Sequence, residues 1–413
     1  MLLTDPTLWF LDLPLIPVME EEDVKFDKRI FEGLTAQGLN KLQFAIVKLE
    51  SCNGTESISF SEASCGYEVL RDKIKRRPCF FPFTSIFKDG VSFLQNLEKA
   101  SNDDIKNMEG YMKDAALRLN AFYKAKERNE SCLKKVFDIR LNREEMAVTE
   151  TDISITLAEH LLGKLAPGES YKIDDKARGE KSCRCGCKVT PVFGGTGIGH
   201  EQVWHGFIDI VFSPHLGIPA IASTVLDREE KISKKRKVEC EQDETQNDDS
   251  SGQRSTEVKQ HSLSQAIAQT IVYSLVEKQK HPNFLHHMIP NIVISPEKVE
   301  ILMYDADSDV LLCSNPILLF NLDLPEERTL IDETVIILWM VLHYRIFCTG
   351  FNKAKPYVLE RCKSNFRQLV ASKWDIYSKS LKSFVSGFPS VEKWPISKLV
   401  QCGLTLEFES DDF

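Results

Sequence analysis

The sequence predicts an α/β protein, in which a mixed β-sheet is flanked by helices and further helices are added at both ends of the chain. Two observations carry this prediction. Short runs of β-branched and aromatic residues alternate with longer amphipathic segments through the middle of the chain. The 413 residues are 42% hydrophobic and 27% charged, a composition that supports a sizeable core.

Changes in composition divide the chain into regions. Residues 1–145 are rich in helix formers, so we expect a mainly helical N-terminal domain there. Residues 146–345 contain the alternating strands and helices of the core. Inside this core, residues 227–254 offer almost nothing apolar to bury, and we expect a disordered insertion. Residues 346–413 are expected to form a basic helical C-terminal region.

The elements of the core follow in order. Thr149 and Asp152 have the spacing of a capping box and predict a helix that begins there. A run of β-branched and aromatic residues at 203–212 predicts a strand. The elements expected after the insertion are a helix at 262–280, strands at 290–305 and 310–320, and a buried helix at 331–347.

An acid and a base stand close together just before the helix at 262–280. Glu257 and Lys259 lie in the short stretch STEVK, which we expect to be a strand, so that both side chains point to one face. Asp209 lies in the earlier strand, within the sequence GFID. If the two strands pair, two carboxylates and an ammonium meet. Carboxylates without nearby histidines suit Mg²⁺ or Mn²⁺, which can activate water for phosphodiester hydrolysis.

Two helices add polar residues to this set. Gln265, Gln269 and Tyr273 recur every fourth residue and form one stripe on the helix that follows Lys259. Glu159 lies on the first core helix. A polar stripe of this kind can edge a site while the opposite, apolar stripe lies on the sheet.

In this order, GFID, EVK and QTIVY resemble the PD-(D/E)xK nuclease superfamily, in particular its RecB-like and lambda-exonuclease-like branch. The resemblance covers residues 149–320 and implies a restriction-endonuclease-like core. It further implies roles for individual side chains. The metal ligands would be Asp209, Glu257 and Glu159, the catalytic lysine would be Lys259, and Gln269 and Tyr273 would line the site. The long insertion between the GFID and EVK segments departs from the family pattern and puts the pairing of their strands in doubt.

The expected function is therefore that of a metal-dependent nuclease acting on DNA. One alternative is a catalytically inactive protein that keeps the nuclease fold for DNA binding or as a scaffold, for instance one derived from a mobile element. At the level of residues, Asp209 and Lys259 can instead form a structural ion pair. Glu257 with Lys259 can be an exposed edge pair, and Glu159 an exposed helix residue.

A cysteine-rich loop gives a third possibility, a zinc-dependent module. Cys183, Cys185 and Cys187 stand two apart, with His200 and His205 downstream. This spacing is not the CxxC pair of a structural zinc site, and it also fits a reactive or loosely chelating loop. His205 would share a strand face with Asp209 and can equally line the nuclease pocket or pack against the sheet.

Charge and hydropathy bear on partners and location. The net charge of −9 argues against a sequence-independent polycation, but residues 351–400 carry ten Lys/Arg and three Asp/Glu. Aromatic residues are interleaved there and can stack bases, if the segment is not simply a helical lid. They are Phe366, Trp374, Tyr377, Phe384 and Trp394. We expect DNA as partner and no membrane, because the longest apolar run, at 333–344, is too short to span one. The basic run Lys234–Lys237 predicts nuclear import, and its alternative is a solvated charge run.

Overall fold

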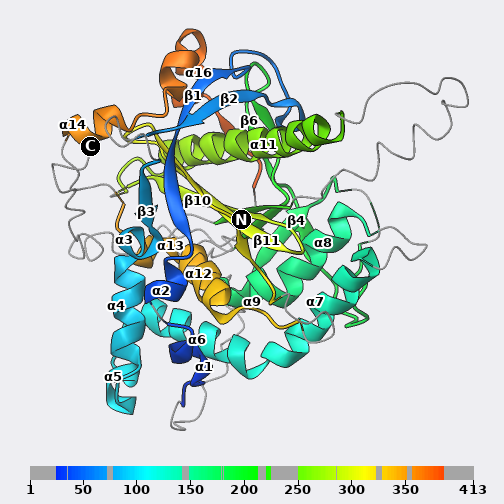
Figure 1. Cartoon of the computed structure of the whole chain (residues 1–413), viewed down its shortest axis with the longest axis vertical. Helices are drawn as coiled ribbons and strands as arrows, with labels where there is room; N and C mark the ends of the chain where they lie inside the picture. Colours follow the sequence, from blue (N-terminus) through cyan, green and yellow to red (C-terminus); the bar gives the residue numbers. More distant parts are fainter. Residues whose placement is uncertain are drawn as a thin grey trace, which may run out of the picture.

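The structure is a computed structural model that describes residues 25–34, 36–71, 78–141, 148–177, 179, 181–212, 220–224, 250–284, 286–321, 328–350 and 356–385. It is a mixed α/β architecture built on a large mixed sheet with helices on its faces (Figure 1). The sheet has 11 strands, and its main path runs β2-β1-β12-β11-β10-β9-β8-β4-β5. A second sheet has three strands in the order β14-β6-β7. The predicted α/β class with a mixed sheet is thus confirmed.

The strands have the following bounds. They are β1 (Gln43–Cys52), β2 (Cys65–Val69), β3 (Phe80–Pro82), β4 (Tyr171–Asp174), β5 (Phe193–Gly194), β6 (Gly197–Gly199), β7 (His205–Phe207), β8 (Ile210–Phe212), β9 (Ile221–Thr224), β10 (Met288–Ile294), β11 (Lys298–Asp305), β12 (Val310–Ser314), β13 (Ile317–Leu318) and β14 (Lys382–Ser383).

The α-helices have the following bounds. They are α1 (Arg29–Glu32), α2 (Ala36–Leu39), α3 (Phe83–Ile86), α4 (Lys88–Leu97), α5 (Asn102–Lys106), α6 (Gly110–Lys124), α7 (Lys126–Leu141), α8 (Glu150–Leu157), α9 (Gly163–Leu165), α11 (Ser250–Lys280), α12 (Asp332–Leu342), α13 (Tyr344–Phe347), α14 (Pro356–Arg361), α15 (Phe366–Leu369) and α16 (Trp374–Lys379). A π-helical turn, η2 (Ala158–Leu162), joins α8 to α9, and a short 3₁₀ turn, η1 (Phe60–Glu62), precedes β2.

Helix α8 begins where the sequence predicts. The Thr149 hydroxyl accepts the N–H of Asp152 (3.2 Å), and the Asp152 carboxylate accepts the N–H of Thr149 (2.8 Å), so both halves of a capping box are present. Every residue of α8 and η2 from Thr151 onward is buried. This helix therefore packs inside the molecule, where its side chains reach the sheet.

The long helix α11 crosses one face of the large sheet, whereas α8, α9 and α12 lie on the other side (Figure 1). It connects β9 to β10, which pair in parallel, while β4, β8 and β9 pair antiparallel. A parallel pair needs such a crossover between its strands. Among the elements of the large sheet and its helices, the chain therefore runs α8, α9, β4, β5, β8, β9, α11 and β10, with the small-sheet strands β6 and β7 inserted between β5 and β8.

Two expectations about the core are wrong in detail. The strand predicted over 203–212 is divided: β7 belongs to the small sheet and β8 to the large one. Helix α11 begins at Ser250, so residues 250–254 are helical rather than part of a disordered insertion. Cooperative extension of a strong helix into a polar segment explains this start, because each added residue gains one backbone hydrogen bond. Residues 225–249 lie outside the described residues.

The N-terminal region is not separate from the core sheet. Helices occupy most of residues 83–141, but β1 pairs with β12 antiparallel, with Phe44 opposite Ser314. The C-terminal region also packs on the sheet, since the aromatic ring of Phe366 stacks on Trp204 at 5.5 Å. Strands from both sides of residue 145 therefore share the large sheet, and the domain borders at 145 and 346 stay predictions from composition.

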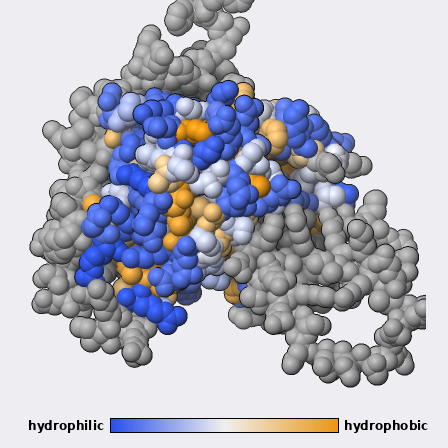
Figure 2. Space-filling model, turned by 90° about the horizontal axis from the view of Figure 1, so that it is seen from above, coloured by the Kyte–Doolittle hydropathy of each residue, from blue (hydrophilic) through white to orange (hydrophobic). Residues whose placement is uncertain are grey.

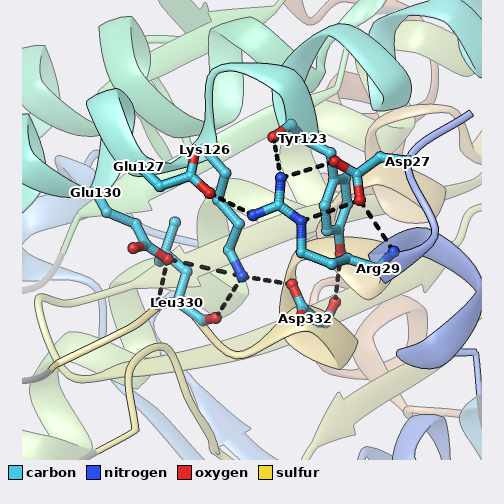
Figure 3. A network of polar contacts seen from close by, with 8 residues as sticks. All are labelled: Asp27, Arg29, Tyr123, Lys126, Glu127, Glu130, Leu330 and Asp332. Carbon is cyan, nitrogen blue, oxygen red and sulfur yellow. Dashed lines mark hydrogen bonds and ion pairs between the residues drawn. The ribbon is translucent and has the colours of Figure 1, made fainter.

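A polar network ties the N-terminal segment to α6, α7 and the start of α12 (Figure 3). Arg29 donates to Asp27 and to the carbonyl oxygen of Tyr123 (2.8 Å). Lys126, only 6% exposed, donates to the carbonyl oxygen of Leu330 (3.0 Å) and to the carboxylate of Asp332. Buried charges of this kind need such complete pairing.

The surface is mostly hydrophilic where Figure 2 shows it, and its apolar atoms form small patches between polar ones. Among the helices described, none combines the length and apolar character needed to span a bilayer.

Candidate metal centre and the Asp209 end of the sheet

Four potential metal ligands converge beside η2. His160 lies on the π-helical turn, and Cys183, Cys185 and Cys187 lie on the loop after β4. Their ligand atoms all lie within 4.8 Å of one another. In the part of the chain that the structure describes, this is the one group of three or more His, Cys, Asp or Glu side chains that meets this criterion. This buried cluster can hold a metal ion.

The distances inside the cluster fit a small ion. The Nε2 atom of His160 lies 3.1 Å from the Sγ atom of Cys185 and 3.5 Å from that of Cys183. The Sγ atoms of Cys183 and Cys185 are 3.2 Å apart. Ligands of a tetrahedral zinc ion, with Zn–S bonds of about 2.3 Å, stand about 3.7 Å from one another. A small outward movement of the side chains therefore accommodates zinc.

The local sequence shapes this cluster from both sides. A π-helical turn inserts an extra residue into a helix, and such turns recur at functional sites. In the loop, Gly186 has a φ of +82° and Lys188 a φ of +60°, which lets three cysteines fold into one tight turn. The guanidinium of Arg184 pairs with the buried carboxylate of Asp152 at 3.1 Å and ties this loop to α8.

The imidazole of His160 is suited to bind a cation. Burial, together with the positive charges of Lys164 and Arg128, lowers its pKa to about 4. The ring is therefore neutral near pH 7, with a nitrogen lone pair available. Burial raises the pKa of Cys183, so in the absence of a cation this thiol keeps its proton.

A cavity of about 320 Å³ lies beside the cluster, and both His160 and Cys187 line it. Cys183, Cys185 and His160 are buried, whereas Cys187 is partly exposed. Glu159 also lines the cavity, and its carboxylate bonds to the hydroxyl of Tyr171.

Asp209 immediately precedes β8, which lies between β9 and β4 in the large sheet. Its Oδ2 atom accepts the N–H of Thr224 (2.7 Å) at the end of β9. Burial, followed by the carboxylates of Glu150 and Asp174, raises the pKa of Asp209 to about 7, although the hydrogen bonds from Thr224 oppose this. Three acidic groups therefore influence one another at this end of the sheet.

Gln269 lies close to this position, as expected. Its Nε2 atom donates to the carbonyl oxygen of Phe207 (3.0 Å), two residues before Asp209. Its Oε1 atom lies 2.8 Å from the Ser223 hydroxyl, which is also 3.1 Å from the Oδ1 atom of Asn291. Gln269 thus links helix α11 to β7, β9 and β10.

The strand expected for Glu257 and Lys259 is wrong, because both residues lie in helix α11. Residues two apart on a helix do not face the same way, so the shared face argued for a strand does not apply. At 1.5 Å per residue, these positions lie about 15–18 Å along the helix from Gln269. The side chains of residues 250–261 lie outside the described residues.

Glu159 does not join Asp209, and Tyr273 has Glu277 and Tyr344 as its electrostatic neighbours. Glu159 meets Tyr171, which pairs with Phe212 at the far end of β8, so this glutamate lies away from Asp209. The glutamate that lies near Asp209 is instead Glu150, nine residues before Glu159 on the same helical segment. Tyr273 is fully buried, and burial together with Glu277 raises its pKa.

The histidine of the metal cluster is His160, not His200 or His205. His200 Nδ1 accepts the N–H of Gln202, and His205 Nδ1 contacts the carbonyl oxygen of Val203 (2.9 Å). Among the C-terminal aromatic residues, Phe366 and Tyr377 are buried in the core and cannot stack bases. The basic run Lys234–Lys237 and Trp394 lie outside the described residues.

Comparison of the chain with protein-family models, with curated proteins and with solved structures finds no match. The site must therefore be interpreted from its own geometry.

Proposed function

We propose that this protein binds nucleic acid through a restriction-endonuclease-like core that lacks the acid–lysine pair for hydrolysis, and that it contains a zinc ion. One observation supports the absence of an acid–lysine pair. In the register of β8 with β9, Ile210 faces Ala222, and continuing that register by one residue would set Ser223 opposite Asp209. The PD-(D/E)xK pattern requires an acid at that position, and the described strand β9 contains neither an acid nor a lysine.

The order of the core elements supports the nuclease-like fold. A capped helix, antiparallel strands, a crossover helix with a polar residue beside the site, and a parallel strand follow in the sequence expected for the family. On β9, the Ser223 hydroxyl bonds to the neutral amide of Gln269, and the Asp209 carboxylate accepts hydrogen bonds from Thr224. The contact between Ser223 and Gln269 joins β9 to α11 without requiring a cation.

Hydrolysis remains the second candidate, favoured by the carboxylates of Glu150 and Asp174 near Asp209. Carboxylates at one end of a sheet are ligands that Mg²⁺ or Mn²⁺ accepts. The two candidates are separated by measuring binding and cleavage of labelled single- and double-stranded DNA with Mg²⁺, Mn²⁺ or EDTA. We expect binding without metal-dependent cleavage. Cleavage that is lost in Asp209→Ala would establish the nuclease instead.

The zinc part of the proposal rests on the donor set. Three thiolates and one imidazole form a Cys₃His site, the usual composition of structural zinc centres, and hard cations such as Mg²⁺ do not select sulfur. Because four protein ligands are present, the ion would be fully coordinated and would fasten the loop to η2. Elemental analysis of the purified protein should find one zinc per chain. The ion should be absent from Cys183→Ser/Cys185→Ser and retained in the control Cys313→Ser.

The basic run Lys234–Lys237 supports a nuclear location for this activity. A fluorescent fusion should enter the nucleus, and replacement of these residues by alanine should leave it in the cytoplasm. Equal distribution of both fusions would contradict this location.

A further inference from the structure

The small sheet presents one face whose side chains are set by its register. Lys382 pairs with Gly199, which pairs with His205 on the other side. Two residues away on the same face, Gly197 pairs with Phe207. The N–H of Phe384 donates to the carbonyl oxygen of Gly197 (2.8 Å). Cross-strand partners share a face of a sheet. The face therefore has two rows, in each of which a glycine stands between two larger side chains.

The opposite face of the small sheet is packed against the protein. Ile198 is 2% exposed, and a Cβ atom at Gly206 would lie 3.0 Å from the ring of Phe60. By contrast, Phe207 is 44% exposed and Phe384 64% exposed. Large aromatic side chains with this exposure on the free side of a sheet are available to a ligand.

The two rings approach Gly197 from the strands on either side of it. A Cβ atom at this glycine would lie 3.4 Å from the ring of Phe207 and 3.4 Å from the ring of Phe384, the distance of an ordinary van der Waals contact. Because glycine has no side chain, β6 places no side chain between the rings at this position. A flat ring placed over Gly197 would contact an aromatic side chain on each side.

The charges on this face indicate which kind of ring would bind between the two phenylalanines. Its six positions include a lysine, Lys382, and a histidine, His205, and no carboxylate. A neutral apolar partner would need no cation, whereas a base attached to a phosphate chain would use both the aromatic pair and the ammonium of Lys382. The face also adjoins the Asp209 end of the large sheet, because Gln269 bonds to the backbone of Phe207.

We propose that Phe207 and Phe384 clamp an unpaired base of a single-stranded nucleic acid above Gly197, with Lys382 beside its phosphate. This inference rests on the proposed nucleic-acid function and specifies its ligand as an unpaired strand. Unpaired bases are needed because a base within a duplex is covered on both faces by its neighbours.

The test measures fluorescence anisotropy of a labelled oligothymidylate with the full chain. Phe207→Ala and Phe384→Ala should each weaken binding by about tenfold, since stacking on aromatic residues contributes at that scale. Gly197→Leu should weaken it similarly by filling the space while both rings remain. Phe80→Ala is the matched control, because Phe80 is 49% exposed on β3, outside this face.

A second probe is an abasic strand with the same phosphates. It distinguishes a failure of the proposed function from a failure of the clamp. Wild type should bind it weakly, and the aromatic variants should bind it as wild type does. If wild type binds neither strand, both the proposed function and this clamp are overturned. If wild type binds oligothymidylate and the three variants bind it equally well, nucleic-acid binding stands and the clamp is overturned. Melting temperatures near that of wild type show that the variants are folded.

Discussion

The Nε2 atom of His160 lies 3.1 Å from the Sγ atom of Cys185, although 25 residues separate them. Burial keeps the imidazole of His160 neutral near pH 7 and raises the pKa of the neighbouring Cys183 thiol. Their approach brings a helix turn and a loop to a common point. A metal ion at that point would convert this contact into a cross-link between η2 and the loop after β4.

The first prediction concerns this cross-link. His160→Ala should lower the melting temperature by roughly 5 °C or more, because metal binding adds directly to the stability of the fold. A zinc chelator should lower the melting temperature of wild type to the same value and leave the variant unchanged. His205→Ala is the control, since its ring lies on the small sheet. A chelator that shifts neither protein would rule out a structural metal.

The second prediction concerns Asp209 and pH. The unfolded chain loses this proton near its ordinary pKa of 3.8, and the folded chain near pH 7. Between these values the folded state binds more protons, so the free energy of unfolding should fall as pH rises and then level off above pH 7. The Asp209→Asn variant lacks this titratable group, so its free energy of unfolding should not show this fall. The variant should therefore match wild type near pH 4 and exceed it by about 2–4 kcal/mol at pH 8.

Urea unfolding at several pH values measures this difference. Asp103→Asn, at an exposed position on α5, is the control and should leave the pH dependence unchanged. A constant offset between Asp209→Asn and wild type at every pH would contradict the shifted pKa.

The third prediction introduces an acid on β9. Ser223→Glu adds a carboxylate at the buried position that would follow Ala222 in the register with β8, where the native hydroxyl bonds to Gln269. Without a divalent cation the variant should be less stable than wild type, because two buried carboxylates repel each other. Millimolar Mn²⁺ should recover much of that stability through binding to the folded state. Ser223→Ala should show no dependence on Mn²⁺, and neither should wild type.

Local signals in the sequence were sufficient for several elements. The capping box at Thr149 and Asp152 predicted the start of α8, since it depends on residues three apart. The three cysteines indicated a metal-binding loop for the same reason. His160 was not found, because its approach to the cysteines depends on a π-helical turn and on a loop folding back, neither of which has a spacing rule.

For the acid–lysine pair, a local sequence signal gave a wrong prediction. Glu257 and Lys259 had the right motif beside a Gln-bearing helix, but the helix extends through them. The strand beside Asp209 proved to be β9, whose residues precede the polar insertion and match no motif. Strand neighbours are set by long-range pairing, so a motif of three residues could not decide which segment joins β8.

The last prediction concerns the buried ammonium of Lys126, which joins α7 to the start of α12 (Figure 3). Its Nζ atom bonds to the carbonyl oxygen of Leu330 and the carboxylate of Asp332, and it lies 3.7 Å from a Glu130 oxygen. Lys126→Ala leaves these acceptors without their cation, so unfolding should require about 3–5 kcal/mol less free energy.

An exposed pair provides the comparison for Lys126. Lys379 and Asp375 lie 3.0 Å apart with both side chains largely in water, so Lys379→Ala should change the free energy of unfolding by less than about 1 kcal/mol. Denaturant unfolding of both variants at neutral pH measures the contrast. If the two variants lose equal stability, the network in Figure 3 contributes no more than a surface ion pair.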